Sequence, residues 1–363
     1  MPELLRPLLV EICIPYCIRP EKYRTGLQLM GSNDGKNAYL AAVKRELLSY
    51  EGSLDGCEVQ ALRLSGGSAT VMSPDLLGNL LKTAREVLPI ARGAECSVDA
   101  QPLTIGTPAL TGIAAGHPNR MELMMHSAND AELRALGCSH TAQDVNNALR
   151  FFGRFRLNNV GLTVDIGIPG QTEGSWENTL RACTIIRPAH ITLEMLNTEG
   201  EEGAPERAVR RRMVQTACAV LKEAGYLRYA AGCFCLPHAA SRFEMARTDG
   251  AESLGLGLGA HTLFDGYLTR NTDNLNIYLS CAGDYGKTTA ELYSVTPEVA
   301  MEYYVQGRLE TVEGLSEERF QARFGCALPD RLRETLKTRI LDGLLEERDG
   351  NFIPTEEGLF RRL

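Results

Sequence analysis

The first 200 residues alternate short apolar segments with longer amphipathic ones, and this alternation is the strongest constraint on the fold. Helical spacing of apolar residues is found at 37–50, 74–88, 142–152 and 175–186. Between and around these helices lie six strand-like apolar segments, at 8–14, 59–65, 94–100, 119–125, 159–168 and 190–195. Alternation of strands and helices is typical of parallel βα units with right-handed crossovers. Six such units predict an α/β fold in the form of an open or closed barrel.

The composition changes after this region. A long helix is expected at 205–226, followed by a mixed segment at 252–283 that contains a glycine run. Three helical segments at 297–308, 315–323 and 328–344 then precede a hairpin turn at Glu347–Asn351, which is the outline of a winged-helix unit. We therefore expect a partial (β/α)6 barrel, an α+β extension and a winged-helix-like domain, at residues 1–204, 205–292 and 293–363.

The bulk properties exclude several classes of protein. The chain has 363 residues and a net charge of −8, which disfavours a large nucleic-acid footprint. No apolar run approaches the roughly 20 residues of a membrane-spanning helix. Glu3 and Glu11 interrupt the apolar N-terminal segment, so we interpret it as a first strand and not as a signal peptide, and expect a cytoplasmic protein.

Eleven cysteines are scattered along the chain. In a cytosolic protein most of them should be reduced and buried as small hydrophobic side chains. Only Cys13 with Cys17, and Cys233 with Cys235, are close enough in sequence to suggest shared chemistry. For both pairs, buried structural thiols remain the competing interpretation.

In parallel α/β folds the functional site lies at the carboxyl ends of the strands, and the segments there carry a resemblance. Six segments carry it, and in chain order they are Ile14–Cys17, Ser65–Thr70, Asp99–Pro102, Ser127–Thr141, Gly167–Trp176 and Gly255–His261. They are similar to the motifs "IPFC", "GGGTPT", "EANP", "SFNDELLRALGRxHT", "GLPGQTxxSW" and "GLGPGAH", respectively. Through these motifs the chain resembles the oxygen-independent coproporphyrinogen oxidase and HemW-type heme chaperone branch of the radical S-adenosylmethionine (SAM) superfamily, and the chaperone type more than the oxidase.

The departures from these motifs bear on function. The family binds a [4Fe–4S] cluster through three cysteines in one loop, and one iron is left free to chelate SAM. Here the first of these positions is Cys17, but the second and third are Glu21 and Arg24, and Cys13 replaces a histidine. A guanidinium cannot bind iron, so the resemblance implies a degenerate cluster motif with Cys17 as a vestigial ligand.

The SAM-binding positions implied by the resemblance are also altered. A vestigial SAM pocket would be formed by Gly66, Gly67, Ser68, Asp99, His126 and Asp165. Ser68 replaces a glycine and His126 a glutamine, whereas Asp99 is a shortened form of the ribose-binding acid. His126 is also a candidate acid, base or ligand, and Asp99 with Asp165 a candidate carboxylate pair, beside the alternative that both are hydrogen-bonded relics.

The heme motif of the chaperones, "HNxxYW", aligns with Phe243, Glu244, Arg247 and Thr248, so none of its residues is present. Cys233, Cys235 and His238 lie nearby and offer soft and imidazole ligands for Zn²⁺ or heme iron. Two buried thiols and a loop histidine are the alternative.

Three hypotheses follow for function. The first is a non-catalytic relative that has no intact cluster, binds SAM weakly or not at all, and has a tetrapyrrole-binding, trafficking or regulatory role. The second is an enzyme, either a coproporphyrinogen oxidase-like radical SAM protein with a rebuilt cluster site or a barrel used for other chemistry. The third is an interaction module that binds a protein partner through its C-terminal domain.

Overall fold

The computed structural model describes residues 5–363. Glu3, which the sequence analysis placed in the N-terminal segment, lies outside the described residues. The six predicted strands are present, and consecutive strands pair in parallel. They are β1 (Arg6–Cys13), β2 (Cys57–Ser65), β3 (Ile90–Ala100), β4 (Arg120–His126), β5 (Val160–Ile166) and β6 (His190–Met195). The α/β prediction is confirmed, and the sheet order β1 to β6 follows the chain as an open, partial barrel.

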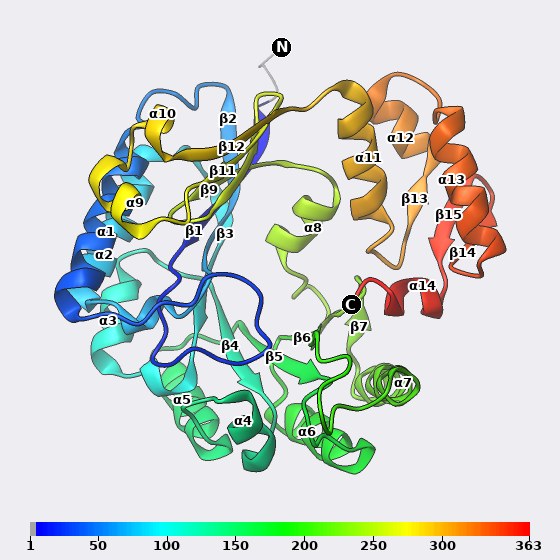
Figure 1. The fold of residues 1–363 in the computed structure, drawn as a ribbon, viewed down its shortest axis with the longest axis horizontal. Coiled ribbons are helices and arrows are strands. Elements are labelled where there is room, and N and C mark those ends of the chain that lie inside the picture. The colour runs from blue at the N-terminus through cyan, green and yellow to red at the C-terminus, as the bar shows by residue number, and fades with distance from the viewer. Residues whose placement is uncertain (1–4) are drawn as a thin grey trace.

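Helices cover the outer face of these strands, as the arc of blue to green ribbons in Figure 1 shows. They are α1 (Asn33–Leu48), α2 (Pro74–Val87), α3 (Thr107–Ala114), α4 (Asp130–Leu136), α5 (Ala142–Arg154), α6 (Glu173–Ile186) and α7 (Arg207–Glu223). Two 3-10 turns, Ala69–Val71 and Pro102–Thr104, follow β2 and β3. The helices and the outward-facing side of the sheet enclose the main hydrophobic core.

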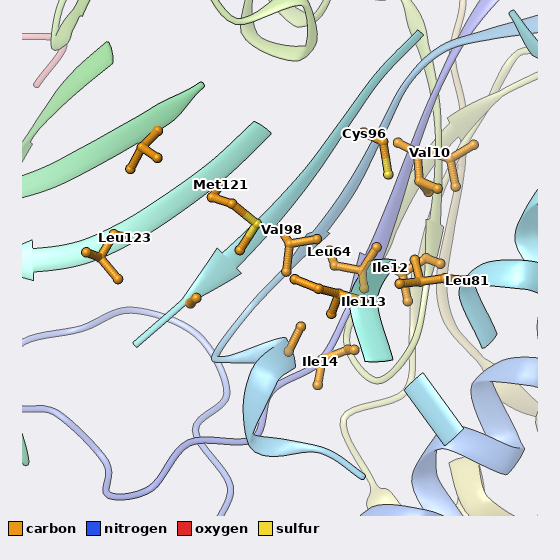
Figure 2. Close-up of a cluster of buried hydrophobic side chains, with 14 of the residues drawn as sticks. Val10, Ile12, Ile14, Leu64, Leu81, Cys96, Val98, Ile113, Met121 and Leu123 are labelled. Carbon is orange, nitrogen blue, oxygen red and sulfur yellow. The ribbon is translucent and has the colours of Figure 1, made fainter. Parts of the chain in front are cut away.

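Figure 2 shows part of this core, where side chains of neighbouring strands meet those of the covering helices. Val10 and Ile12 of β1, with Val98 of β3, are fully buried. Leu81 of α2 and Ile113 of α3 close the cluster from the helical side. Because apolar residues line the outer side of the strands, the opposite side is left to the polar and charged residues described below.

The region after the sixth strand extends the sheet at both edges, which the periodicity did not predict. On one side, β8 (Cys233–Cys235) and β7 (Leu227–Arg228) pair antiparallel beyond β6. On the other, β9 (Glu252–Leu256) pairs in parallel with β1, and β10 (His261–Phe264), β11 (Tyr267–Asn271) and β12 (Thr289–Ser294) follow antiparallel. Three short helices belong to this region: α8 (Arg242–Thr248), α9 (Leu275–Cys281) and α10 (Tyr285–Thr288).

The predicted glycine run ends β9, and its packing explains the need for glycine. Gly257 has a φ of +106°, and an added Cβ would lie 2.5 Å from the carbonyl oxygen of Cys13. A side chain there would therefore separate β9 from the end of β1. His261 begins β10 and is exposed to solvent.

The last part of the chain has a hydrophobic core of its own, centred on Phe320 and Phe352. Its helices are α11 (Pro297–Arg308), α12 (Glu317–Phe324), α13 (Asp330–Leu341) and α14 (Glu356–Phe360), and its strands are β13 (Leu315–Ser316), β14 (Leu345–Arg348) and β15 (Asn351–Pro354). The predicted hairpin turn lies at Asp349-Gly350, both with positive φ, as a type I′ turn requires. This winged-helix-like unit is the orange and red group in Figure 1. Within residues 5–363, no helix combines the length and apolar composition that a membrane crossing requires.

Candidate functional site

A cavity of about 440 Å³ lies on the inner side of the sheet, toward the carboxyl ends of its strands. Four of the predicted pocket and cluster residues line it, namely Cys17, Gly66, Gly67 and Asp99. Cys233 of β8 lines it as well. The structure therefore brings together residues from the loop after β1, the turn after β2, strand β3 and the sheet extension.

The loop after β1 approaches the turn after β2 closely because Gly67 has no side chain. An added Cβ on Gly67 would lie 2.6 Å from the Tyr16 carbonyl oxygen and 2.7 Å from that of Ile14. The neighbouring Ser68 N–H donates to Tyr16 O at 2.8 Å. Ser68 itself is buried, and its hydroxyl lies within hydrogen-bond distance of Thr70 and Thr104, so it belongs to the turn and not to the cavity wall.

Arg24 is the centre of a buried ion-pair network at the cavity. Its Nη2 donates to both carboxylate oxygens of Asp165 at 2.9 Å, and its Nη1 donates to Glu194. Its Nε lies 3.6 Å from Glu21 Oε2. Asp165 is fully buried and the Arg24 side chain is 17% exposed, so the guanidinium carries its charge into the protein and is balanced there by three carboxylates.

His126 ends β4 in an unusual backbone conformation. Its φ is +61°, and the Ser127 N–H donates to Met125 O at 2.8 Å, which makes His126 the central residue of a γ-turn with positive φ. The pairing of β4 with β5 shifts register at the same place. This strained turn buries the imidazole completely: Nδ1 contacts Arg24 and lies 3.2 Å from Asp165 Oδ2, and Nε2 lies 3.2 Å from Glu21 Oε2.

Glu21 is fixed by both its backbone and its side chain. Gln28 exchanges two hydrogen bonds with the Glu21 backbone, at 2.7 and 2.9 Å. Gln101 Nε2 donates to Glu21 Oε1 at 2.9 Å. The second oxygen, Oε2, is left facing His126 and Arg24.

The charges of this network shift its pKa values in opposite directions. Burial alone would raise the pKa of Glu21, but the charges of His126 and Arg24 lower it to about 2. Burial alone would lower the pKa of His126, but the Asp165 and Glu21 carboxylates raise it to about 9. The His126 imidazolium and the Glu21 carboxylate are therefore the stable forms at neutral pH.

Three further ion pairs, made by two arginines, line the inner cavity wall. Arg63 Nη2 donates to Asp99 Oδ2 at 3.0 Å, and its Nη1 donates to Glu244 at 3.2 Å. Arg120 Nε donates to Glu122 Oε1 at 2.5 Å. Each pair leaves buried atoms without a hydrogen-bond partner: Arg63 Nε, Asp99 Oδ1, Arg120 Nη2 and Glu122 Oε2. Such atoms are costly unless water or a ligand reaches them, so this wall is suited to a polar ligand with both donors and acceptors.

The two predicted carboxylates have different partners. Asp99 pairs with Arg63, and Asp165 pairs with Arg24 and His126. Each acid is thus neutralised by its own arginine. The arrangement favours the hydrogen-bonded alternative over an acid–base pair of the two.

Within each predicted cysteine pair, the two thiols have different surroundings. Cys17 lines the cavity, whereas Cys13 packs against Gly66, and burial together with the charges of Glu11 and Glu46 raises the Cys13 pKa to about 12. Cys233 lines the cavity, but Cys235 is buried within the sheet extension and His238 is exposed. In residues 5–363, neither pair belongs to a group of three convergent metal ligands.

One such group does occur, formed by Glu21, His126 and Cys138, with ligand atoms that all lie within 4.8 Å of one another. The sequence interpretation missed Cys138, and it assigned Arg24 no positive role. A signal for Cys138 was present, because it occupies the arginine position of the "LRALGRxHT" motif. The sequence also held a signal for Arg63 and Arg120 as cavity residues, because each is a charged residue in a mostly apolar strand segment.

Comparisons with known proteins place these features in context. The model of the HemN C-terminal domain matches residues 295–361. The heme chaperone HemW of Lactococcus lactis is 22% identical over 94% of this chain and 92% of its own length. The heme chaperone HemW of Escherichia coli is 23% identical over 98% and 96%, respectively.

Among solved structures, coproporphyrinogen III oxidase (HemN) from Escherichia coli, described as a radical SAM enzyme, superposes with a TM-score of 0.85. The superposition covers 98% of this chain and 89% of the oxidase at 19% sequence identity. At this identity the likeness establishes the fold.

Proposed function

We propose that the chain is a non-catalytic member of the HemN/HemW-like family of the radical SAM superfamily and uses the barrel as a binding scaffold, which its similarity to these proteins supports. In this proposal the protein holds no [4Fe–4S] cluster and binds SAM weakly or not at all. Its cavity would instead hold a tetrapyrrole or another polar small molecule, in a trafficking or regulatory role.

The position of Arg24 is the observation that carries the proposal. In a three-cysteine loop its place would present a thiolate, but here a guanidinium points inward and pairs with Asp165, Glu194 and Glu21. A cubane bound at one iron by Cys17 alone would lack two protein ligands, and a carboxylate at Glu21 is already engaged by Gln101. The residues of this loop therefore do not fit the cluster.

The SAM-binding side fits no better. Asp99, which would hold the ribose, accepts a hydrogen bond from Arg63, and Asp165 is occupied by Arg24. Without an open iron, the amino and carboxylate groups of SAM lose the metal that would chelate them. Losing two charge-assisted hydrogen bonds, at about 1.5–3 kcal/mol each, weakens binding on the order of a hundredfold or more.

Anaerobic reconstitution with iron and sulfide, followed by iron counting and low-temperature electron paramagnetic resonance, tests the proposal. We expect the wild type to take up no stoichiometric cluster. The matched variant Glu21→Cys/Arg24→Cys recreates the three-thiolate spacing and should gain iron, which shows that the assay detects a cluster in this scaffold. Near-stoichiometric cubane in the wild type, with a spectrum that responds to SAM, would overturn the proposal.

Cys233 supports the tetrapyrrole part of the proposal, because it is the member of the Cys233, Cys235 and His238 set that lines the cavity. Thiolate is one of the common axial ligands of heme iron. Titration with hemin should give a Soret band that Cys233→Ser shifts or removes, while the exposed His238→Ala leaves it unchanged. Identical titrations for the wild type and Cys233→Ser would exclude Cys233 as the ligand.

The rival function, a radical SAM enzyme with a rebuilt cluster site, is favoured by one observation. Cys17, Gly66 and Gly67 still face the same cavity, so one thiolate and the glycine turn retain their places. The reconstitution experiment separates the two functions, since the enzyme requires iron and the scaffold does not. Micromolar SAM binding by calorimetry would also favour the enzyme.

A further inference from the structure

Glu21, His126 and Cys138 come from three separate parts of the chain and converge at one buried point. Glu21 lies in the loop after β1, His126 ends β4, and Cys138 follows α4. Their ligand atoms lie within 4.8 Å of one another. Glu21 and His126 are buried and Cys138 is partly buried, so the convergence does not arise from crowding of side chains at the surface.

The local structure holds Cys138 in this position. Helix α4 ends in a Schellman motif, in which Gly137 adopts a φ of +77° and the Cys138 N–H donates to Leu133 O at 2.9 Å. The Lys22 N–H donates to Leu136 O at 2.8 Å, so the loop that carries Glu21 is bonded to the end of the same helix. The separation between Glu21 and Cys138 is therefore fixed by backbone hydrogen bonds.

A second observation points to a ligand at this place. The Nε2 atom of His126 is completely buried and has no hydrogen-bond partner, although Glu21 Oε2 lies only 3.2 Å away. Two zinc ligands with bonds of about 2.0–2.1 Å at a tetrahedral angle lie about 3.3 Å apart. The unpartnered nitrogen and the carboxylate oxygen thus have the spacing of two ligands that share one ion.

On its other side the imidazole has a carboxylate partner, although Arg24 Nη2 contacts the same ring nitrogen. Asp165 Oδ2 lies 3.2 Å from His126 Nδ1. When Nδ1 carries the proton and donates it to a carboxylate, the Nε2 lone pair is directed at the metal, and the ring is held in orientation. Arg24 stays paired with Asp165 and Glu194, which keeps the outer carboxylates neutralised.

We propose that Glu21, His126 and Cys138 form a divalent transition-metal site, for which zinc is the best-suited ion, with Asp165 as the residue that orients His126. Oxygen, nitrogen and sulfur together are a ligand set that zinc accepts, whereas magnesium and calcium require oxygen ligands. His126 binds as the neutral imidazole and Cys138 as the thiolate, so each releases one proton to solvent when the ion binds. A water molecule completes the four ligands of the ion.

The site goes beyond the proposed function, and it is distinct from an iron–sulfur site because it uses neither Cys17 nor sulfide. Glu21 is nevertheless shared, because it occupies the second position of the cysteine motif and is also a ligand of the proposed site. A chain that held a cluster through Cys17 would contain iron and acid-labile sulfide, whereas the proposed site binds a single ion without sulfide. The two proposals can therefore fail independently.

The test uses the full-length protein, freed of metal by chelation and titrated with Zn²⁺ and with Co²⁺ as a spectroscopic probe. We expect one ion per chain and, with Co²⁺, the near-ultraviolet charge-transfer band of a thiolate–cobalt bond. Cys138→Ser should remove this band and weaken binding at least tenfold. Cys281→Ser, which changes a partly buried cysteine elsewhere, is the matched control and should leave both unchanged.

Two further variants separate a ligand role from a folding role. His126→Asn keeps a residue that tolerates positive φ, and should weaken binding strongly while circular dichroism stays native. Asp165→Asn should weaken binding by about 10- to 100-fold and retain the charge-transfer band, as expected for a residue that orients a ligand. A wild type that binds no zinc at micromolar concentrations, or a thiolate–cobalt band that persists in Cys138→Ser, would overturn the proposal.

Discussion

Two segments at the carboxyl ends of the strands match the same family but differ in what their residues do. The turn at 167–176 matches nearly all of the family motif, whereas the loop at 14–24 matches only its first half and has Glu21 and Arg24 where the resemblance implies cysteines. In the turn, Gln171 accepts from the N–H groups of Gly167 and Ile168 and donates to Asp165 O. Every one of these bonds shapes the backbone.

The helix after that turn is equally structural. Thr172 caps α6 through the Ser175 N–H, and Trp176 is fully buried with its Nε1 donating to Met213 O at 2.8 Å. In the loop at 14–24, by contrast, Glu21 and Arg24 stand at positions where the resemblance implies cluster cysteines, and both side chains belong to a protein ion-pair network. The comparison teaches that the matching turn is held by backbone and capping hydrogen bonds, whereas the departing loop is held by charged side chains.

The largest effect is expected in the structural turn. Trp176→Ala removes a fully buried indole and leaves Met213 O without its donor, and should lower the free energy of unfolding by about 3–5 kcal/mol. Chemical denaturation measures the loss. Ile185→Ala on the same helix, where the side chain is 84% exposed, is the control and should have almost no effect. Similar losses for the two variants would contradict the structural role of Trp176.

Arg24 should be nearly as important, although it lies in the altered loop. Arg24→Ala leaves Asp165 buried with only His126 to balance it, and breaking a buried pair in this way costs about 3 kcal/mol. The exposed Arg19 of the same loop provides the control as Arg19→Ala. A stability equal to that of the wild type would show that Arg24 does not stabilise the barrel.

Gly67 distinguishes a backbone role from a ligand-binding role within the predicted SAM pocket. Gly67→Ala places a Cβ against the carbonyls of Ile14 and Tyr16, and the overpacking should cost about 1–3 kcal/mol even without any ligand. Gly153→Ala, in a helix where the added Cβ meets no atom within 4 Å, should be neutral or stabilising. Thermal unfolding of both variants measures the difference, and an unperturbed Gly67→Ala would return this glycine to a purely cofactor-related role.

The smallest effect is expected at the rim of the ion-pair network. Glu194 is 45% exposed, so Glu194→Gln should cost less than about 1 kcal/mol even though Arg24 contacts it. Double-mutant cycles with Arg24→Ala measure the coupling of the pair. A coupling as large as that between Arg24 and Asp165 would mean that the network acts as one unit and not as a buried pair with a solvated rim.

The sequence by itself determined the barrel and the changes in it. Short apolar segments between amphipathic helical ones located all six parallel strands, because buried strands and amphipathic helices are encoded locally. The hairpin turn at Asp349-Gly350 was likewise readable, since few residue pairs adopt positive φ twice. The prediction that Glu21 and Arg24 occupy the second and third positions of the cysteine motif needed only the spacing from Cys17.

Only the tertiary structure decided which residues meet at the candidate site. Three features join residues that are far apart in the chain. They are the pairing of β9 with β1, the ion pairs of Arg24 with Asp165 and Glu194, and the convergence of Glu21, His126 and Cys138. Parity along β8 gives Cys233 and Cys235 the same side of the strand, yet only Cys233 lines the cavity. Local patterns fix the direction of a side chain, but its partners depend on which strand ends and helix ends the fold brings together.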